Sequence, residues 1–242
     1  MALGALYYPK GTGENPIKFE TLYIPYIYKE IYLEGVYLDI MNSFKGTDDK
    51  VIIDVGSNIG ITVQYFRDYA KKVYAIEPAS EHFEALAKNK KFNKWDNVEV
   101  FKLAIADKDG EMTLNKFNDN LTCNSLINDY KQGSEVVKTQ TFNTFFKENE
   151  IGVVDFMKFD VEGAEESILC APGFADVAPR IKSMMVEMHY PSFPKIVDHL
   201  IGLGFKAKRY PSSAVIFLFE RWNKLIHVKL DYGKEKAKIG FA

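Results

Sequence analysis

The sequence predicts an α/β fold, built on one open and mostly parallel β-sheet that is closed by an antiparallel pair of strands. Two observations support this prediction. Apolar, β-branched runs alternate with segments in which apolar residues recur at helical spacing, a pattern typical of strand–helix–strand units. Near the end of the chain, residues 205–209 and 214–219 form two strand-like runs joined only by a Pro-Ser-Ser turn, so we expect them to pair in an antiparallel manner.

Length and composition fit one domain. A chain of 242 residues with 47% hydrophobic residues can bury one substantial core. Its formal net charge of −2 provides no basic field, so no nucleic-acid partner is expected. The two cysteines, Cys123 and Cys170, provide neither a disulfide framework nor a metal-binding spacing, which favours a cytoplasmic location. Because no apolar run could span a bilayer and Pro9 interrupts the first segment, we expect neither a membrane partner nor a signal peptide.

The pattern divides the chain into three parts. Residues 1–45 form an N-terminal arm and cap, residues 46–221 the main domain, and residues 222–242 a tail with few patterned apolar residues. The start of the arm is rich in glycine and proline and is expected to be irregular. Tyrosines recur between positions 23 and 37 and predict a cap, which serves either as packing or as a lid over a ligand.

The first strand, residues 51–55, leads through a glycine-bearing loop into a helix. Gly56 and Gly60 allow a close approach that side chains would block, and the first turn of the helix offers unpaired N–H groups to an anionic or polar ligand. A dinucleotide fingerprint would need glycine at the positions of Asn58 and Ile61, and no lysine follows as in a phosphate-binding loop. The expected ligand is therefore adenosine-like and without phosphates.

The second strand, residues 72–76, ends at Glu77, and Pro78 stops it. Glu77 lies roughly twenty residues beyond the glycine loop, where a carboxylate at a strand end can accept hydrogen bonds from both hydroxyls of a ribose. The order of loop, helix, strand and terminal acid favours S-adenosylmethionine as the ligand.

A helix that begins near Ser80 and a third strand at residues 98–103 continue the alternation. Residues 111–114 and 136–139 predict two short strands of an insertion. The polar stretch between them, residues 118–128, is interpreted as a solvent-exposed loop, with the border of an acceptor pocket as the alternative.

Two helices complete the predicted layers. Phe142 and Phe145 recur at helical spacing before the fourth strand, and Ile196 and Leu200 do so after the fifth strand. In each segment, an apolar stripe on one side predicts a helix that packs on the sheet.

The fourth strand, residues 153–159, delivers the densest group of polar residues. Ligands of open α/β sheets bind beyond the carboxyl ends of the strands, so Asp160 is expected to share one crevice with the glycine loop and the acid of the second strand. Strand alternation puts Lys158, Asp160 and, if the strand continues, Glu162 on one face. Because unpaired buried charge is costly, Lys158 is interpreted as a partner in an ion-pair network.

The fifth strand, residues 181–188, carries Glu187 near its end, with His189 just beyond. An imidazole titrates near neutral pH, so His189 is a candidate general base, with a hydrogen-bonded structural histidine as the alternative. Asp160 is a second candidate, although a carboxylate is a weak base unless its pKa is raised, and Glu187 would orient or replace the base. The same acids, with Glu162, could ligate a divalent ion, but the lysine beside them argues against a metal, and none is expected.

Three segments resemble the signature blocks of the FkbM family of S-adenosylmethionine-dependent methyltransferases. They run from Asp54 to Gly60, from Ala75 to Pro78 and from Asp155 to Glu165, and the last has the most specific pattern, K-x-D-x-E-G-x-E. The resemblance implies a class I methyltransferase fold, which is a Rossmann-like three-layer sandwich with a mostly parallel seven-stranded sheet, a closing antiparallel strand and an N-terminal cap. One departure is Asn143, where the family usually has an aspartate.

The resemblance also implies which residues hold the cofactor. Glu30 and Tyr37 would approach the methionine end of S-adenosylmethionine, while Ala104 and Ile105 would hold the adenine ring, largely through their backbone. The expected cofactor-binding residues are Glu30, Tyr37, Asp54, Gly56, Ser57, Asn58, Gly60, Glu77, Pro78, Ala104, Ile105 and Asp160. The expected catalytic residues are Asp160, His189 and Glu187.

We therefore predict a methyltransferase that uses S-adenosylmethionine to methylate a hydroxyl oxygen of a small molecule or glycan. Alignment of the reactants can supply about 7–11 kcal/mol, and a nearby base a further factor of roughly 10²–10⁴. Two alternatives stay open: a module that binds the cofactor without turnover, and a nicotinamide-dependent oxidoreductase, which Asn58 and Ile61 disfavour. Neither the acceptor nor the oligomeric state is indicated by the sequence.

Overall fold

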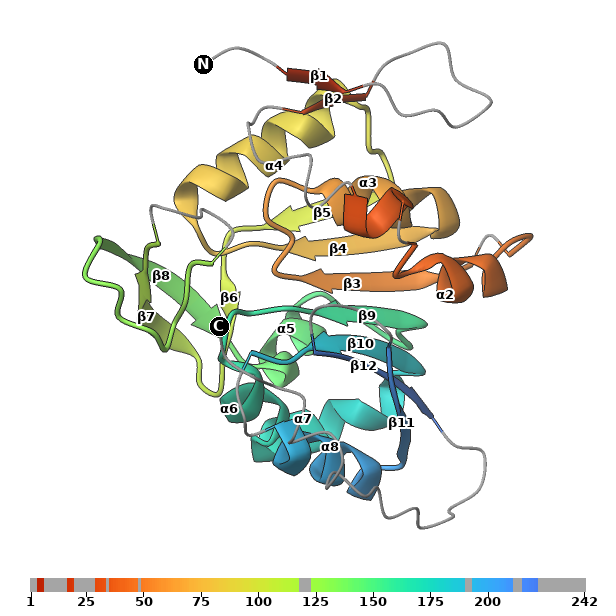
Figure 1. Cartoon of the computed structure of the whole chain (residues 1–242), viewed down its shortest axis with the longest axis vertical. Helices are drawn as coiled ribbons and strands as arrows, with labels where there is room; N and C mark the ends of the chain where they lie inside the picture. Colours follow the sequence, from red (N-terminus) through yellow and green to blue (C-terminus); the bar gives the residue numbers. More distant parts are fainter. Residues whose placement is uncertain are drawn as a thin grey trace.

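Figure 1 shows the computed structural model, which describes residues 4–6, 17–19, 29–33, 35–47, 49–117, 123–189, 193–210 and 215–221. The predictions for the rest of the arm and cap and for the tail, residues 222–242, lie outside the described residues. The side chain of Glu30 also lies outside them, although its backbone belongs to the π-helix η1, Lys29–Leu33.

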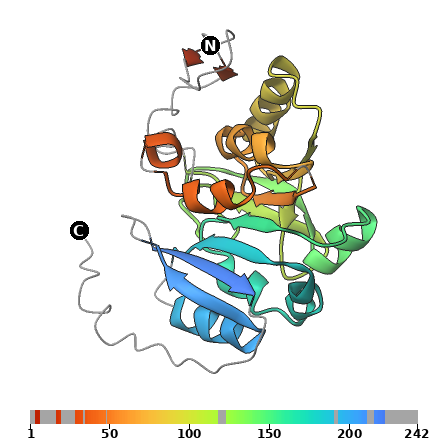
Figure 2. The ribbon, with the colours of Figure 1, turned by 90° about the vertical axis from the view of Figure 1, so that its right-hand side faces the viewer.

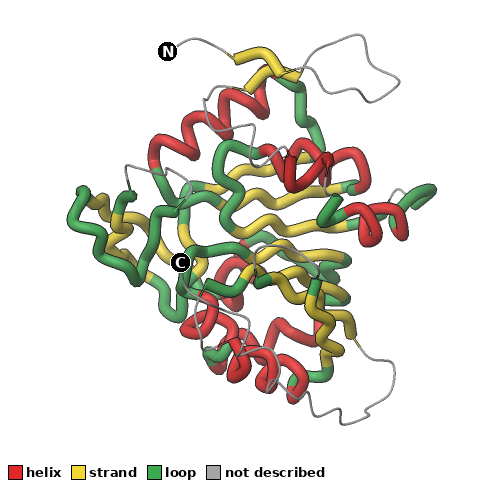
Figure 3. Tube along the Cα trace, viewed as in Figure 1, coloured by secondary structure: helices red, strands yellow, loops and turns green. Residues whose placement is uncertain are grey.

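One seven-stranded sheet forms the centre of the fold (Figures 1 and 3), with the strands in the order β11-β12-β10-β9-β3-β4-β5. The strands are β3 Val51–Val55, β4 Lys72–Ile76, β5 Val98–Phe101, β9 Phe156–Phe159, β10 Ser183–Glu187, β11 Phe205–Arg209 and β12 Ile216–Arg221. β12 runs antiparallel to both of its neighbours, and the other paired strands run parallel. The predicted sheet, mostly parallel and closed by an antiparallel strand, is confirmed.

Two hydrophobic cores cover the two faces of this sheet, which gives the predicted three layers (Figure 2). Neighbouring strand residues alternate between the cores: Ile53 belongs to one and Ile52 to the other. The helices on the first face are α5 Phe142–Glu148, α6 Glu165–Leu169, α7 Pro172–Val177 and α8 Phe193–Gly202, and those on the second are α2 Leu38–Ser43, α3 Ile61–Phe66 and α4 Ser80–Phe92. Each helix therefore buries an apolar stripe against the sheet, as its sequence pattern requires.

Short regular segments also occur where the sequence pattern predicted none. The arm contains an antiparallel pair, β1 Gly4–Leu6 with β2 Ile17–Phe19, so the prediction of an irregular arm is wrong at these residues. Two 3₁₀ helices, η2 Arg67–Tyr69 and η3 Ala178–Arg180, continue α3 and α7.

The third predicted strand, residues 98–103, ends two residues early, and a separate short strand follows it in another sheet. β5 stops at Phe101, and the next residues form β6, Ala104–Ile105, which pairs in parallel with Thr139 and Gln140. β6 belongs to a small sheet with β7 Gly110–Asn115 and β8 Ser134–Gln140, in the order β6-β8-β7. The partner strand is β8, which lies more than thirty residues farther along the chain. It takes up the backbone hydrogen-bonding groups of residues 104 and 105, so these residues join the small sheet.

The topology fixes where a ligand can bind. The chain enters the sheet at its centre with β3, continues to β4 and β5 on one side, and then returns to β9 and β10 on the other side. The helices on either side diverge at such a switch point and leave a crevice at the carboxyl ends of the strands. Among the described residues, no helix is both long and apolar enough to cross a membrane.

Candidate active site

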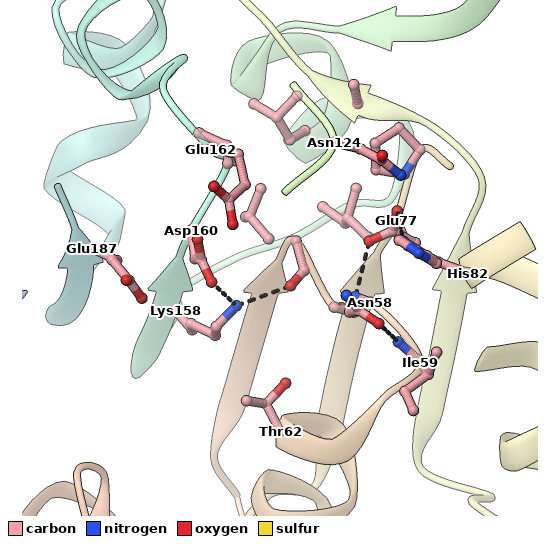
Figure 4. Close-up of a pocket in the computed structure, with 18 of the residues that line it drawn as sticks. Asn58, Ile59, Thr62, Glu77, His82, Asn124, Lys158, Asp160, Glu162 and Glu187 are labelled. Atoms are coloured by element: carbon pink, nitrogen blue, oxygen red, sulfur yellow. Dashed lines mark hydrogen bonds and ion pairs between the residues drawn. The ribbon is translucent and has the colours of Figure 1, made fainter. Parts of the chain in front are cut away.

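A cavity of about 180 Å³ opens at the carboxyl ends of β3, β4 and β9, next to residues of the small sheet (Figure 4). The predicted site residues that line it are Tyr37, Gly56, Ser57, Asn58, Glu77, Pro78, Ala104, Ile105, Asp160 and Glu187. Residues from three separate strand ends therefore meet in one pocket.

Three other predicted site residues, Asp54, Gly60 and His189, are not among the residues that line this pocket. Asp54 is completely buried beneath it, and Gly60 packs between helices, while His189 contacts acids that do line the pocket. The direct roles predicted for these three residues stay predictions, and the structure places each of them next to residues that line the pocket.

Gly56 is the point at which the end of β3 approaches the end of β9. Its φ of 79° lies in the left-handed region, and a Cβ atom here would lie 1.9 Å from the carbonyl oxygen of Asp160. The N–H groups of Gly56 and Ser57 both donate to the carbonyl of Ile76, each at 3.0 Å. The loop is thus held against two neighbouring strands, and only glycine fits at its first position.

Gly60 is required for helix packing. It precedes α3 with a φ of 92°, and a Cβ atom would lie 2.6 Å from Leu86 and 3.0 Å from Trp95. Both of these neighbours are buried in the core between α3 and α4. Gly60 therefore serves helix packing, and the cofactor contact predicted for it stays a prediction.

Asn58 occupies the loop position at which a dinucleotide-binding protein would have glycine. Its φ of 50° is left-handed, a conformation that asparagine tolerates better than other non-glycine residues. Its side-chain oxygen accepts the N–H of Ile59 at 2.7 Å, which closes the turn locally. The loop can therefore keep its shape with a polar side chain facing the pocket (Figure 4).

Glu77 connects this loop to the end of β4. Its Oε2 accepts the N–H of Asn58 at 2.8 Å, and its Oε1 accepts the N–H of Ala79 at 2.9 Å. His82, a pocket residue on α4, has its Nδ1 3.5 Å from the same Oε1 (Figure 4). A carboxylate oxygen can accept more than one hydrogen bond, so each oxygen of Glu77 keeps capacity for a ligand hydroxyl.

Asp54 and Lys158 form a buried ion pair below the loop. The Lys158 Nζ lies 3.6 Å from Asp54 Oδ1, and the Thr62 hydroxyl donates to Asp54 Oδ2. Complete burial raises the pKa of Asp54, while the Lys158 ammonium and the Thr62 hydroxyl act in the opposite direction. Asp54 is therefore a structural residue, linking β3 to α3.

Lys158 connects three parts of the site. Its ammonium donates to the carbonyl of Gly56 at 2.9 Å and lies 3.2 Å from Asp160 Oδ2 (Figure 4). Burial opposes its charge, but the carboxylates of Asp160 and Asp54 outweigh burial and hold its pKa well above the ordinary lysine value. The ion-pair interpretation of Lys158 is thus realised, and the lysine also fixes the loop carbonyl.

His189 lies at the centre of a group of acids. Its Nδ1 lies 2.8 Å from Glu165 Oε1, and its Nε2 lies 3.4 Å from Glu162, 3.7 Å from Glu187 and 3.8 Å from Asp160. Although burial disfavours the charged ring, the hydrogen bond to Glu165 and the charges of Asp160 and Glu162 raise the pKa of His189 to about 10. The ring is therefore a cation at neutral pH and does not suit the role of general base that the sequence predicted.

Glu162 is a carboxylate of this group whose pKa is raised by its surroundings. Burial and the nearby charge of Asp160 raise its pKa to about 7, against the lowering effect of His189. β9 ends before it, and its φ of 54° turns its side chain into the pocket, which it lines. The strand does not continue to Glu162, which was the condition for placing it on the face of Asp160, yet its side chain still reaches the same pocket as Asp160 (Figure 4).

The same residues have the spacing of a metal site. Ligand atoms of Asp160, Glu162 and His189 lie within 4.8 Å of one another. Both nitrogens of a protonated imidazole are hydrogen-bond donors, so His189 in its charged form has no lone pair for a metal ion. Without a metal ion the group is a cluster of carboxylates around a histidine cation, and the expectation that no metal binds stays a prediction.

The insertion between β7 and β8 forms one wall of the pocket. Asn124 and Leu126 line the cavity, and the amide oxygen of Asn124 accepts the N–H of Phe117 at 3.1 Å. The buried Ser125 hydroxyl donates to the carbonyl of Glu162 at 2.6 Å. Here the alternative of a pocket border is realised in place of a solvent loop, while residues 118–122 lie outside the described part of the chain.

Sequence reasoning did not assign His82, Leu103 and Leu114 to the pocket, and it gave Asn124, Leu126 and Glu162 only within alternative or conditional interpretations. His82 lies in the first turns of α4, five residues after Glu77. This short distance from a strand-end acid could have predicted that His82 lines the same pocket. The three leucines lie on or beside the small sheet, whose position depends on long-range pairing. No local pattern could have placed them.

A comparison with protein-family models finds one match, to the methyltransferase FkbM domain, over residues 54–207. This stretch contains the glycine loop, Glu77, Asp160 and His189, and it covers more than half of the chain. It begins at Asp54, the buried acid of β3, and ends within β11.

Two characterised relatives are similar to this chain in sequence. The hexuronic acid methyltransferase AglP of Haloferax volcanii is 26% identical over 155 residues, which are 64% of this chain and 62% of the relative. Methyltransferase 1 of Beauveria bassiana is 26% identical over 170 residues, which are 61% of this chain and 67% of that protein. The match thus spans about two-thirds or less of the length of each relative.

Two solved structures share the fold. The METTL16 MTase domain superposes with a TM-score of 0.52 and 13% sequence identity, covering 81% of this chain and 68% of that one. The methyltransferase FkbM of Methylobacillus flagellatus superposes with a TM-score of 0.50 and 13% identity, covering 72% of this chain and 44% of that one. The three-layer architecture around the pocket is therefore the class I methyltransferase fold.

Proposed function

Because the chain belongs to the FkbM methyltransferase family, we propose that it uses S-adenosylmethionine to methylate an oxygen atom of a small molecule or glycan. One observation carries the proposal: Gly56, Glu77 and Asp160, from three strand ends, surround a single pocket. The pocket lies at the switch point of the sheet, which is where open α/β proteins bind their ligands.

The residues at one end of the pocket fit a nucleoside. Glu77 presents two carboxylate oxygens that each retain hydrogen-bonding capacity, which suits the two hydroxyls of a ribose. Ala104 and Ile105 form a buried apolar surface with Leu103, and Leu126 of the insertion faces the same space. We assign this surface to the adenine ring.

The other end of the pocket fits a cation. Gly56, Tyr37 and Asp160 line it, and Asp160 brings a carboxylate to this end. When bound, S-adenosylmethionine supplies a methyl group attached to a positively charged sulfur. Asp160 would attract that charge, while Lys158 keeps the carboxylate in place.

The acceptor class is inferred from the relatives. AglP is named for a hexuronic acid, which suggests that a sugar or sugar acid is the first acceptor to test. Glu162 and Glu187 line the pocket together with Asp160 and would surround the acceptor. For the cell, we propose the cytoplasm as the location, in keeping with two cysteines that form no disulfide.

Binding of the donor is the first test. Calorimetry with S-adenosylmethionine should give micromolar affinity, and the same titration with NADH should give no heat. Absence of heat with S-adenosylmethionine in a sample with a cooperative unfolding transition would remove the proposal. Binding without transfer to any acceptor would favour the second candidate, a module that has the site but no turnover.

Transfer is the second test. Methyl-labelled donor is incubated with p-nitrophenyl β-D-glucuronide and, as the uncharged counterpart, p-nitrophenyl β-D-glucoside, and products are separated by mass spectrometry. Asp160→Asn should bind the donor more weakly, because the attraction for the sulfonium is lost. Unchanged donor affinity in Asp160→Asn would overturn the assignment of that residue.

A further inference from the structure

We propose that Glu162 accepts the proton of an acceptor hydroxyl during methyl transfer, so that the methylated atom is a hydroxyl oxygen and not a carboxylate. This inference rests on the proposed function and assigns a role within it. A carboxylate acceptor carries no proton at neutral pH and would need no such base, whereas an alcohol oxygen is a poor nucleophile until its proton is leaving.

The backbone holds Glu162 where an acceptor would meet it. The residue follows the end of β9 with a φ of 54°, and its side chain lines the pocket between Asp160 and the insertion (Figure 4). The Ser125 hydroxyl binds its carbonyl at 2.6 Å, and Ser125 also accepts the N–H of Asn128 at 3.1 Å. The carboxylate is therefore presented by a fixed turn rather than by a free loop.

Most of the other acids around the pocket make contacts elsewhere, and Glu187, which also lines the pocket, is compared with Glu162 by the variants below. Asp54 is completely buried beneath the loop, and Glu165, which is 2% exposed, holds His189 Nδ1 and the N–H of Gly163. Asp160 forms an ion pair with Lys158, whose Nζ lies 3.2 Å from one oxygen, while its second oxygen is buried without a hydrogen-bond partner among the described residues. Glu77 lies at the nucleoside end and accepts two backbone N–H groups.

The charges that face Glu162 suit proton transfer at neutral pH. Burial and the carboxylates of Asp160 and Glu165 favour its protonated form, while His189 and Lys158 favour the anion, and the balance raises its pKa to about 7. A base is most effective when its pKa lies near the working pH, because it is then deprotonated yet still binds a proton well. His189, which is a cation, cannot serve as this base and instead stabilises the anion of Glu162 at 3.4 Å.

The step balances without any further reactant. The hydroxyl oxygen forms a bond to the methyl carbon as the carbon–sulfur bond breaks, and the electron pair of that bond stays on sulfur. The hydroxyl proton passes to a carboxylate oxygen of Glu162 and is afterwards released to solvent. No oxidant, reductant or metal ion is needed.

The first experiment measures Glu162 itself, without an acceptor. Protein labelled with ¹³C at the glutamate carboxyl carbons is titrated by NMR, and the Glu162 resonance is assigned by its loss in Glu162→Gln. A midpoint near pH 7 is expected, and Glu166→Gln, which changes an exposed carboxylate on α6, should leave that resonance in place. A midpoint in the ordinary range of glutamate overturns the proposal, even when no acceptor is methylated.

The second experiment measures transfer with the two glycosides. The wild-type rate should rise with pH through about 7 and then level off, because only the deprotonated carboxylate accepts the proton. Glu162→Gln should lose a factor of roughly 10²–10⁴ in kcat together with this rising limb. Its affinity for S-adenosylmethionine should stay close to wild type, which separates failure of this assignment from failure of the cofactor assignment.

The products and a competing variant complete the test. A methyl ether, stable to mild base, is expected from the glucoside or glucuronide, whereas a base-labile ester as the sole product would overturn the proposal. Loss of the rising limb in Glu187→Gln with its retention in Glu162→Gln would transfer the role to Glu187, which also lines the pocket.

Discussion

The carbonyl oxygen of Asp160 lies where the side chain of residue 56 would begin: a Cβ atom at Gly56 would be 1.9 Å away from it. Glycine at this position lets β3 and β9 approach each other, and Lys158 spans the same gap by binding the Gly56 carbonyl and the Asp160 carboxylate. The shape of the pocket therefore depends on how closely two strand ends pack.

Replacement of Gly56 by alanine should weaken both folding and donor binding. The new Cβ must displace the backbone of Asp160, and its left-handed φ adds strain, so the free energy of unfolding should fall by more than about 1 kcal/mol. Gly46→Ala is the matched control, because Gly46 has a φ of 77° and no neighbour within 4 Å. Equal losses in the two variants by urea denaturation would show that strain alone, and not contact with Asp160, is responsible.

Replacement of Lys158 by methionine should destabilise the protein strongly. It leaves Asp54 buried without its cation, and breaking such a pair by removing one partner typically costs about 3–5 kcal/mol. The double variant Lys158→Met with Asp54→Asn should recover part of this loss, since the orphaned charge is then gone. A double variant no more stable than Lys158→Met, measured by chemical denaturation, would contradict the buried ion pair.

Replacement of Glu77 by glutamine should reduce the affinity for S-adenosylmethionine at least tenfold. The amide NH₂ group cannot accept a hydrogen bond, so it loses the Asn58 or Ala79 N–H and one ribose hydroxyl together. Glu81→Gln, an exposed change four residues farther along in α4, is the control. Calorimetry that finds equal affinities for the two variants would refute the assignment of Glu77.

His189 should make stability fall at alkaline pH. Its pKa is raised from 6.5 to about 10, so its contribution is complete below pH 6.5 and is lost as pH rises through about 10. Between these values the unfolded chain has released a proton that the native protein retains, and the unfolding free energy should decline by up to about 1.4 kcal/mol per pH unit. His189→Asn should remove this part of the slope in urea denaturation at pH 7, 8 and 9, and an unchanged slope would contradict the charged ring.

The sequence predicted the strands of the main sheet and the glycine loop because their signals are local. Residues 51–55 show a β-branched run, and Gly56 and Glu77 stand at fixed distances from the strand ends. The break after Phe101 could not be predicted, because it depends on pairing with Thr139 and Gln140 in a distant segment. The local pattern favoured a strand up to residue 103, whereas tertiary pairing starts a separate strand at residue 104.

Charge state was the least predictable property of the site. An isolated histidine titrates near neutral pH, which supported a base at His189, but the Glu165 carboxylate that holds its Nδ1 comes from 24 residues earlier in the chain. Conversely, the sequence did not distinguish Glu162 from other acids that follow a strand. Its burial beside Asp160 is what raises its pKa. The pKa values of these groups depend on burial and on neighbouring charges, which the order of residues does not reveal.

The hydrogen bond from Ser125 to the Glu162 carbonyl couples the insertion to the turn after β9. Leu126, the next residue along the chain, faces the part of the pocket assigned to adenine, so occupation of that part also restrains the turn that carries the acid. The donor would thus prepare the far end of the cavity before an acceptor arrives, which implies an ordered sequence of binding. Slower amide exchange of residues 161–163 after addition of S-adenosylhomocysteine would measure this coupling, and unchanged exchange would exclude it.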